Sequence, residues 1–582
     1  MRVRVRAEAR LLGGLAAGIG VLALAGLGLG AQPGSAAVPD AAPAAQEVVV
    51  DLSGVQPEEA ARLAEAVPAW EEAIGAGTTR ITITRDEADA LRRAGFAVRI
   101  AALAEPLPPW PACYRRLADV YAHARALAAA HPDLLTLLDI GDSHCKAIGG
   151  CTTPGGQTVA GEDLLVMRVT NAAAPGAKGR LWVDAGIHAR EVPTVELVMA
   201  FLEELVTGFG VDPTITALLS AREVHIGLVS NPDGRLLVEM GAHPPFDSEP
   251  WQWRKNGRLE GAPCGWPPTS GNHAGIDLNR NHDFQWDAEG HSDEPCAQTY
   301  RGTSPASEAE IKAFEDYVRT IFPDQRGPLD ADASPPDATG LLVNYHNATY
   351  PGTVLVPWGW TTERTANDAE LNAIARRYAA HNGYAVQYAL YPVSGNTRDW
   401  GYGELGVPSY VIELQGNRFV TPCRERDQVL RHNLPAMLML LSLADRPFER
   451  VAGPELVRVA ARLEQGALRV AARASSVRGG RQAVAGAAAW FTRADGGRLD
   501  GLPHPAEDAE GLALGAADGA FDAASESLVG ALDVGSAPAG RHLVIVAARD
   551  ALGRAGPPVA RWFEAPARRR LNESAIRRSG AR

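Results

Sequence analysis

The fold of this chain is decided by residues 180–191, Arg-Leu-Trp-Val-Asp-Ala-Gly-Ile-His-Ala-Arg-Glu. The apolar run Arg180–Ala185 predicts a buried strand, and the apolar periodicity of Val195–Phe209 predicts an amphipathic helix. His188 and Glu191 therefore lie where a strand ends and a helix begins. At that spacing an imidazole nitrogen and a carboxylate oxygen can bind one cation, and zinc accepts both ligand types. The same pair also occurs in ordinary surface turns, so its meaning depends on partners elsewhere in the chain.

The apolar segments around this stretch alternate between strand and helix patterns. Such alternation predicts, over residues 110–446, an α/β domain with a mixed, mostly parallel sheet flanked by helices. His346 and Glu413 lie at the ends of two predicted strands, where sheets of this kind bind ligands. Residues 230–234, Ser-Asn-Pro-Asp-Gly, predict a turn. The predicted strands are Leu134–Ile140, Asp163–Val169, Val224–Val229, Leu341–Tyr345 and Ser409–Leu414, and the predicted helices are Tyr114–Ala130, Ser307–Ile321, Ala366–Asn382 and Glu425–Ala444.

The N-terminus has the features of an export signal over residues 1–37. Four arginines lie within the first ten residues, an uncharged run of 21 residues extends from Leu11 to Ala31, and small residues follow it. These features predict cleavage after Ala31, Ala36 or Ala37 and a secreted or extracytoplasmic protein. The run is also long enough to span a bilayer, so a retained membrane anchor is the alternative.

Residues 47–102 predict a small α+β unit ahead of the main domain. A Pro-rich connection, Leu103–Pro111, follows it. Two interpretations stay open for this unit: a pro-segment that restrains the main domain, or a purely structural domain. Its predicted strands are Val48–Leu52, Arg80–Ile83 and Phe96–Ile100, and its predicted helices are Pro57–Ala66 and Asp86–Ala94, the second capped by Thr84.

Residues 452–566 show a different pattern, with short apolar segments, Gly-rich turns and little helical periodicity. This pattern predicts a β-sandwich, in which no catalytic cluster is visible. Its final predicted strand, within Arg541–Ala548, and the turn after it resemble the end of immunoglobulin-like modules of secreted bacterial enzymes. Residues 567–582 are polar and predict a disordered tail. The other predicted strands are Leu456–Ala461, Leu468–Ala471, Ala487–Thr492 and Leu528–Val534.

Composition limits the classes of partner. The chain has 582 residues and a net charge of −13, which argues against nucleic acid and anionic membrane surfaces as partners. The even count of six cysteines, in an exported protein, predicts three disulfides. Cys145 and Cys151 flank a Gly-Gly turn and could close a small loop, and free buried thiols are the alternative. Because no Cys-x-x-Cys occurs, the sequence does not predict a cysteine zinc site.

Five short motifs, in a fixed order, carry a family resemblance. They are Trp253–Asn256, Asp277–Asn281, Asn344–His346, Tyr391–Trp400 and Val411–Leu414. With these motifs, the region from Cys113 to Ala444 resembles the zinc metallocarboxypeptidases, such as the pancreatic carboxypeptidases A and B and the bacterial carboxypeptidase T. The fold expected from the resemblance is the α/β fold that the alternating pattern also predicts.

The resemblance implies a single Zn²⁺ ion held by His188, Glu191 and His346. It also implies that Asp277 hydrogen-bonds one of the ligand histidines and fixes its tautomer. Because His346 follows Glu191 by 155 residues in the sequence, only folding can bring the third ligand to the metal.

The resemblance assigns the chemistry to two further residues. Glu413 is similar to the general base that takes a proton from zinc-activated water and delivers it to the leaving amine. Arg254 is similar to the cation that holds the scissile carbonyl oxygen while negative charge develops on it. Cys264 and Cys296 occupy the places of a family disulfide, which leaves Cys113 and Cys423 as the remaining candidate pair.

Substrate binding is implied for five polar side chains. Asn279 and Arg280 resemble the pair that grips the terminal carboxylate, where a guanidinium can make two parallel hydrogen bonds. Tyr391 resembles a mobile tyrosine that closes over that carboxylate, and Arg190 an arginine further along the cleft. Arg398 occupies the base of the specificity pocket, where its charge predicts a preference for acidic C-terminal residues.

Two alternatives stay open for this specificity pocket. Arg398 could instead pair with Asp399 or Glu404, which would leave an apolar pocket with broad or apolar specificity. A preference for basic C-terminal residues is the third possibility, and repulsion from the guanidinium argues against it.

The leading hypothesis for function is an exported, monomeric zinc exopeptidase that removes one amino acid from the C-terminus of peptides or proteins. A second hypothesis keeps the zinc machinery but takes cell-wall peptides as substrate. A third is a non-catalytic binding module of the same fold. Asn279 and Arg280 favour a substrate with a free α-carboxylate, and the presence of Glu413 and Arg254 argues against an inactive module.

Overall fold

The computed structural model describes residues 46–55, 77–174, 176–269, 271–389, 392–495, 498–499, 511–534 and 539–565. Four predicted features lie outside these residues: the export signal, the helix Pro57–Ala66, Tyr391 and the C-terminal tail. The chain divides into two units, Met1–Ala45 and Gln46–Arg582, and the structure described below belongs to the second.

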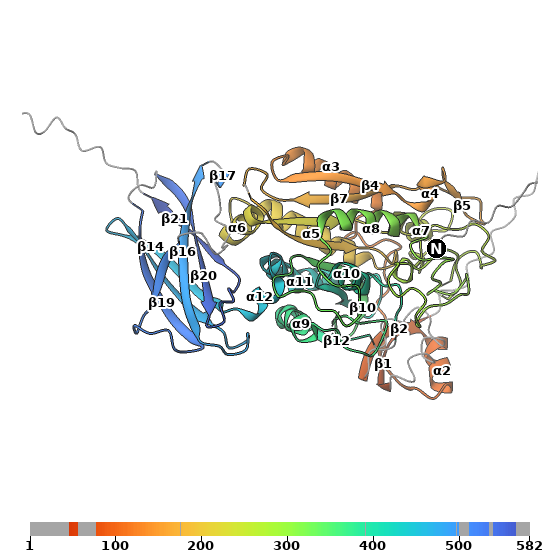
Figure 1. Cartoon of the computed structure of the whole chain (residues 1–582). Coiled ribbons are helices and arrows are strands. Elements are labelled where there is room, and N and C mark those ends of the chain that lie inside the picture. The colour runs from red at the N-terminus through yellow and green to blue at the C-terminus, as the bar shows by residue number, and fades with distance from the viewer. Residues whose placement is uncertain are drawn as a thin grey trace, which may run out of the picture. The chain divides into compact units, whose positions relative to one another are not determined.

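An eight-stranded mixed sheet forms the centre of the α/β domain in the described part of the chain (Figure 1). Its strand order is β12-β11-β13-β10-β8-β9-β7-β4. The four central strands β13, β10, β8 and β9 run parallel. At one edge β7 and β4 are antiparallel to their neighbours, and towards the other edge β11 is antiparallel to β13 and parallel to β12. The strands are β4 (Leu135–Asp142), β7 (Asp163–Val169), β8 (Gly179–Ala185), β9 (Arg222–Gly227), β10 (Leu341–Thr349), β11 (Thr353–Leu355), β12 (Ala385–Gln387) and β13 (Ser409–Gln415).

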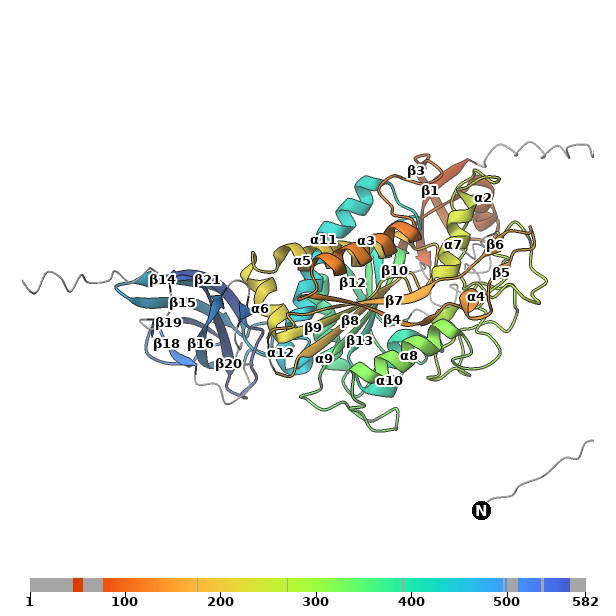
Figure 2. The same cartoon turned by 90° about the horizontal axis from the view of Figure 1, so that it is seen from above.

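Helices cover the two faces of this sheet, with α3, α5 and α11 on one side and α8 and α10 on the other (Figure 2). Their buried apolar side chains join one core, in which Trp182 of β8 packs edge-on against Phe314 of α8 at 5.3 Å between ring centroids. The mixed α/β fold expected from the sequence is therefore confirmed. The helices are α3 (Leu117–Ala130), α5 (Val192–Gly208), α6 (Pro213–Ala221), α7 (Pro232–Gly241), α8 (Ala309–Ile321), α9 (Asp368–Asn382), α10 (Thr397–Leu405), α11 (Cys423–Leu443) and α12 (Pro447–Ala452).

Two sequence predictions in this domain are wrong in detail. Residues 230–234 do not form an isolated turn, because the Asn231 side chain accepts a hydrogen bond from Gly234 N at 2.9 Å and caps α7. The Pro232 ring, which suggested a turn, is instead suited to the first helical position. In addition, β10 runs past Tyr345 to Thr349, so His346 lies within a strand rather than after one. The short elements β11, β12, α6 and α10 were not predicted at all.

The small α+β unit predicted for residues 47–102 lies at the start of Gln46–Arg582. Its described residues form a three-stranded antiparallel sheet of order β2-β1-β3 and one helix, α2. Thr84 caps α2 in a reciprocal arrangement with Glu87, as its sequence position predicts. Thr82 N donates to Asn417 O at 2.7 Å, and Ala348 and Phe419 of the α/β domain pack into the core of the unit. The elements are β1 (Glu47–Val55), β2 (Gly77–Thr84), α2 (Arg85–Arg93) and β3 (Ala97–Leu103).

The C-terminal region is all-β, as predicted, but its strands join one antiparallel path of order β14-β15-β19-β18-β16-β20-β21. The unpredicted strand β18 pairs with both β16 and β19 and so connects what would be two separate sheets of a sandwich. The last strand among the described residues is β21, which follows the predicted last strand. The elements are β14 (Glu455–Glu464), β15 (Ala467–Ser475), β16 (Val484–Asp495), β17 (Arg498–Leu499), β18 (Leu512–Ala516), β19 (Ser525–Asp533), β20 (Gly540–Asp550) and β21 (Val559–Ala565).

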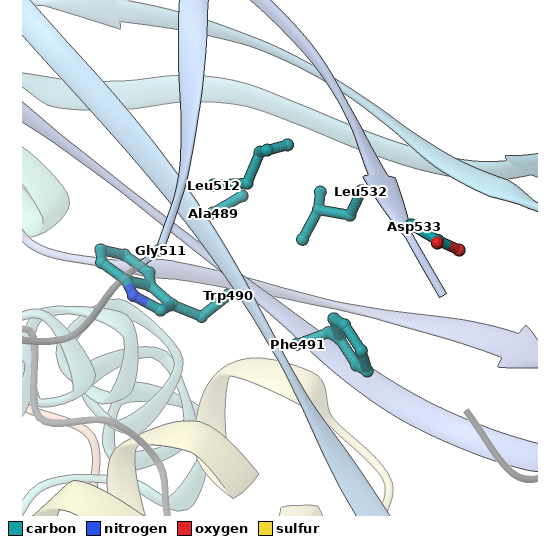
Figure 3. A pocket seen from close by; sticks show the side chains of 7 residues that line it. All are labelled: Ala489, Trp490, Phe491, Gly511, Leu512, Leu532 and Asp533. Carbon is teal, nitrogen blue, oxygen red and sulfur yellow. The ribbon is translucent and has the colours of Figure 1, made fainter. Parts of the chain in front are cut away.

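A cavity of about 460 Å³ opens between β16, β18 and β19 (Figure 3). Its lining is apolar and aromatic except for Asp533, its single ionisable side chain among the described residues. Among its described lining residues there is no acid–base pair and no set of metal ligands.

Three disulfides form in the described structure, and their pairing is the predicted one. Cys145 bonds Cys151 within a short loop, and Cys264 bonds Cys296 across 32 residues. Cys113 bonds Cys423 across 310 residues and ties the segment before α3 to the start of α11. None of the described cysteines is free, which excludes the alternative of buried thiols.

Candidate active site

Three buried side chains converge beyond the carboxyl end of β8. The donor atoms of His188, Glu191 and His346 all lie within 4.8 Å of one another. His188 Nδ1 lies 2.8 Å from Glu191 Oε1 and 3.1 Å from His346 Nδ1, and His346 Nδ1 lies 3.3 Å from Glu191 Oε2. The strand and turn that carry the first two residues are the stretch 180–191, and the adjacent parallel strand β10 supplies the third.

The hydrogen bonds outside this group fix both imidazole tautomers. His188 Nε2 donates to Asp277 Oδ1 at 3.2 Å, and its Nδ1 accepts from Arg254 Nη1 at 3.1 Å, since a guanidinium can only donate. His346 Nε2 bonds Asn344 Oδ1. Both Nδ1 lone pairs therefore point at each other and at the Glu191 carboxylate. This group of acceptors could hold a cation, and histidine nitrogens with a carboxylate oxygen are ligands that zinc accepts.

The orientation of Asn344 is itself fixed by Asp184, its register partner on the adjacent strand β8. Asn344 Nδ2 donates to Asp184 Oδ2 at 2.9 Å, so its oxygen must face His346. Asp184 also accepts from Ser230 Oγ at 2.8 Å and from Trp182 Nε1 at 3.1 Å. Sequence reasoning missed Asp184 and Asn344 as supporting residues, although Asn344 belongs to a quoted motif and Asp184 is a lone acid in an apolar strand.

Electrostatics favour a charged carboxylate in the group. Burial acts to raise the pKa of Glu191, but the adjacent His188 and His346 lower that pKa to about 2. Burial likewise acts to raise the pKa of Asp277, whereas Arg254, Arg280 and His188 hold it far below its usual range. Both carboxylates are therefore ionised at neutral pH.

Arg254 lies against this group. Its Nε and Nη2 donate to Asp277 Oδ2 at 3.0 and 2.8 Å, and its main-chain oxygen accepts from Ala189 N at 3.1 Å. The guanidinium is thus fixed both to the carboxylate that orients His188 and to the turn that carries the group. The structure thus brings Arg254, Asp277 and the three candidate ligands together.

Glu413 is brought to the same place by strand register. In the parallel pair β10–β13 it is the register partner of His346, and register partners on adjacent strands point to the same face of a sheet. Its side chain is buried, with 3% exposure. A carboxylate therefore lies one strand away from the candidate metal ligand His346, on the same face.

Asn279 and Arg280 lie in the short 3₁₀ helix Leu278–Arg280, directly after Asp277. Asn279 Oδ1 accepts from Thr397 N at 3.0 Å and from Thr397 Oγ1 at 3.2 Å, so the amide group is anchored to the start of α10. Arg280 Nε donates to Gly290 O at 2.9 Å, and the side chain is fully buried. Both residues thus belong to the same short segment as Asp277, beside the candidate metal ligands.

Arg398, on the first turn of α10, points into the interior, with 2% exposure. Its Nε lies 3.5 Å from Asp399 Oδ1, and its Nη2 lies so close to Gly359 that a Cβ there would be 1.8 Å away. Asp399 in turn accepts from Gly359 N and Trp360 N at 2.8 Å each. The sequence left two arrangements open: Arg398 facing the substrate, or Arg398 paired with Asp399 or Glu404. The structure contains a contact between Arg398 and Asp399.

Arg190 lies 4.2 Å above the ring of Phe419, and its Nη1 donates to Gln252 O at 3.5 Å.

The second possible group of metal-binding residues in the described chain is His144, Cys151 and Glu260, but Cys151 is bonded to Cys145 and offers no thiolate. The group around His188 is therefore the candidate metal centre.

Comparison with known proteins agrees with this geometry. Residues 152–436 match the family model described as zinc carboxypeptidase, whose members use Zn²⁺. Carboxypeptidase A1 from Sus scrofa is 29% identical over 314 residues, which is 52% of this chain and 63% of the relative. Zinc carboxypeptidase A 1 from Anopheles gambiae is 29% identical over 343 residues, 56% of this chain and 67% of the relative.

One solved structure shows the fold. The crystal structure of thrombin activatable fibrinolysis inhibitor aligns with a TM-score of 0.52 at 21% identity, over 69% of this chain and 99% of that one. The chain spans 63% of the length of its porcine relative. None of the described helices is long and apolar enough to cross a membrane. Residues 152–436, which contain His188, Glu191 and His346, are therefore similar in sequence to the zinc carboxypeptidases, and the α/β domain has a carboxypeptidase-like fold.

Proposed function

We propose that this chain is an exported zinc carboxypeptidase that hydrolyses the C-terminal peptide bond of peptides and proteins. The observation that carries the proposal is the direction of the two Nδ1 lone pairs, of His188 and His346, towards Glu191. When bound by these residues, zinc supplies a Lewis acid that polarises a water molecule and the substrate carbonyl.

Glu413 is the general base in this proposal. It accepts the proton of the attacking water and returns it to the departing amine, since one carboxylate can act first as base and then as acid. Its register pairing with His346 and its burial support the role. A buried carboxylate on the same face as the metal ligands can reach the attacking water without crossing bulk solvent.

Arg254 stabilises the negative oxygen that forms from the scissile carbonyl. Its Nη1 lies 3.1 Å from His188 Nδ1, so one N–H of the guanidinium already points towards the metal group. The other two donors are used on Asp277, which keeps the cation in place before the substrate arrives. Preorganised donors of this kind need little rearrangement when the charge develops.

In this proposal Arg280 and Asn279, in the short segment that follows Asp277, bind the substrate carboxylate. Asn279 uses its oxygen on Thr397, which leaves its Nδ2 as the side-chain group for a substrate carboxylate. Tyr391 closes this subsite and Arg190 contacts the substrate further along the cleft. These assignments favour a free α-carboxylate next to the cut bond.

The acidic preference is proposed for the pocket that holds Arg398. A substrate Glu or Asp would share the guanidinium with Asp399, whose oxygens are already satisfied by the N–H groups of Gly359 and Trp360. The contact between Arg398 and Asp399 equally supports the alternative, a pocket with broad or apolar preference. The relative kcat/KM values for substrates that differ in this residue separate the two.

Residues 47–102 are proposed as a pro-segment. The unit packs on the segment after β13: Arg418 Nη2 donates to Glu47 Oε2 at 3.2 Å, and Phe419 contributes to the core of the unit while its ring lies under Arg190. Limited proteolysis near Leu103 is expected to raise activity. Unchanged activity after clean removal of the unit would leave it a structural role.

One experiment tests the reaction itself. The purified mature protein is incubated with a mixture of peptides, with and without a zinc chelator, and the products are read by mass spectrometry. Loss of single C-terminal residues, abolished by chelation and restored by Zn²⁺, is expected. Cleavage of cell-wall peptides alone would favour the second hypothesis, and binding without cleavage would favour a non-catalytic module.

A further inference from the structure

His273 is a fully buried histidine that lies next to Arg254 and has no assigned role. Its Nε2 accepts a hydrogen bond from the main-chain N–H of Arg254 at 3.3 Å, and its Nδ1 lies 3.1 Å from Thr269 O. The ring packs against Trp253, with 4.8 Å between ring centroids. The histidine therefore touches the residues on both sides of the peptide unit that leads into Arg254.

The partners of the ring leave one protonation state. An amide N–H can only donate, so Nε2 must carry the lone pair, and a carbonyl oxygen can only accept, so Nδ1 must carry the hydrogen. Burial, followed by the positive charges of Lys255, Arg190 and Arg254, holds the pKa of His273 well below its usual value. The hydrogen-bond partners and the lowered pKa both favour a neutral imidazole with its hydrogen on Nδ1.

Hydrogen bonds also join His273 and Lys255 to residues 295–297. His273 N donates to Cys296 O at 3.4 Å, and Lys255 Nζ donates to Pro295 O and Ala297 O at 2.8 Å each. The carbonyl oxygens of residues 295–297 therefore accept hydrogen bonds from His273 and Lys255, which both contact or adjoin Arg254. The Cys264–Cys296 disulfide anchors the segment that carries these carbonyls. His273 is the link from this segment to the Arg254 main chain.

We infer that His273 is a positioning residue for Arg254. The hydrogen bond from Arg254 N to His273 Nε2 fixes the position of the Arg254 main chain, so that the guanidinium contacts both Asp277 and the carbonyl oxygen of the scissile peptide bond. The inference rests on the proposed function. His273 does not touch the substrate, and it acts through the peptide N–H of Arg254. The Arg254 side chain branches from the same residue, so a shift of that N–H moves the guanidinium with it.

Two amide substitutions separate the two hydrogen bonds of the ring. In His273→Gln the amide oxygen can occupy the place of Nε2 and still accept from Arg254 N, whereas in His273→Asn the shorter amide reaches only Thr269 O. His273→Asn is expected to lower kcat between about 10- and 100-fold with little change in KM, because a displacement of about 1 Å of a catalytic group can cost about 100-fold. His273→Gln is expected to recover most of the loss.

Binding measurements add a readout that a structural role would not change. A peptide phosphonate places a negative tetrahedral oxygen where Arg254 acts, and a free C-terminal amino acid contacts only the carboxylate subsite. His273→Asn is expected to weaken phosphonate binding by about the same factor as kcat/KM and to leave binding of the amino acid unchanged. The matched control is His225→Asn, which removes another buried histidine, bonded to Glu223 and Tyr317 away from the site; its kcat is expected to equal that of the wild type.

A double-mutant cycle tests whether His273 affects kcat through Arg254. In an Arg254→Met background the further change His273→Asn is expected to have no additional effect on kcat, because its target is gone. An effect of equal size in both backgrounds, or wild-type kcat in His273→Asn, would overturn the inference. If His273→Asn does not fold, His273→Leu and His273→Gln provide the same contrast. A wild-type protein that binds zinc and does not hydrolyse any peptide would instead overturn the proposed function.

Discussion

The α/β domain and the C-terminal β region bury their polar side chains in different ways. In the described part of the C-terminal region the buried polar residues are Ser476, Glu526, His542 and Asp550. Three of them bond backbone close in sequence: Glu526, for example, accepts from the N–H groups of Asp522 and Ala523. Such bonds stabilise turns between strands and need no further explanation.

In the α/β domain the buried polar groups instead contact side chains far away in the sequence. His188 bonds Asp277 across 89 residues, and its Nδ1 faces that of His346 across 158. Burial of so many ionisable groups costs free energy unless each one is paired. The comparison teaches that the buried ionisable groups of the candidate site come together from distant segments, whereas Glu526 and Asp550 of the C-terminal region bond within their own turns.

The largest effect that would test this comparison is expected from Glu413→Gln. The amide cannot accept a proton, so kcat should fall by about 10²–10⁴-fold or more. Because Glu413 is not among the candidate ligands, bound zinc should stay at one ion per chain. Metal analysis alongside peptide hydrolysis measures both, and wild-type turnover in this variant would refute the assigned base.

Arg254→Met is expected to rank next. Loss of the guanidinium removes the donor for the developing oxyanion, which typically costs about 10²–10³-fold in kcat. The change also leaves Asp277 without its closest cation, so thermal unfolding should be recorded with the kinetics. If kcat were unchanged while KM rose, Arg254 would act in substrate binding rather than in stabilising the transition state.

Arg398→Ile is expected to change the choice of substrate more than the rate. With Arg398 present, substrates that end in Glu should have a higher kcat/KM than those that end in Phe, by about tenfold for a single charge-assisted pair. The substitution should reverse this order. A preference for Phe in the wild type that Arg398→Ile leaves unaltered would show that Arg398 is occupied by Asp399 and that the pocket is apolar.

Asp550→Ala should have the smallest effect on catalysis. Asp550 accepts from Leu552 N and Arg554 N at 3.0 Å and pairs with the Arg554 guanidinium at 2.7 Å, all within one turn after β20. Its loss leaves these groups unsatisfied and should lower the free energy of unfolding of the C-terminal region by about 1–3 kcal/mol. Calorimetry should detect the change while kcat and KM stay at wild-type values; a fall in kcat would weaken the division between the two regions.

The sequence by itself determined the elements and the residue types of the site. Periodicity located the parallel strands β8, β9, β10 and β13, because buried parallel strands are nearly continuous apolar runs. It also located the antiparallel strands β4 and β7. It missed short edge strands such as β11, whose three residues carry too little pattern, and it missed α7, where Pro232 was read as a turn residue rather than as the start of a helix. In the C-terminal region it found five strands but not β18, which joins them into one sheet.

Only the tertiary structure decided how these residues act on one another. The direction of the His346 ring depends on Asn344, whose own amide is turned by Asp184, and no local pattern contains that chain of hydrogen bonds. The same holds for His273, which reaches Arg254 through a loop 19 residues away. Motifs record which side chains are present; tautomers, register and buried pairs arise from contacts between distant segments, and these exist only once the strands have been aligned.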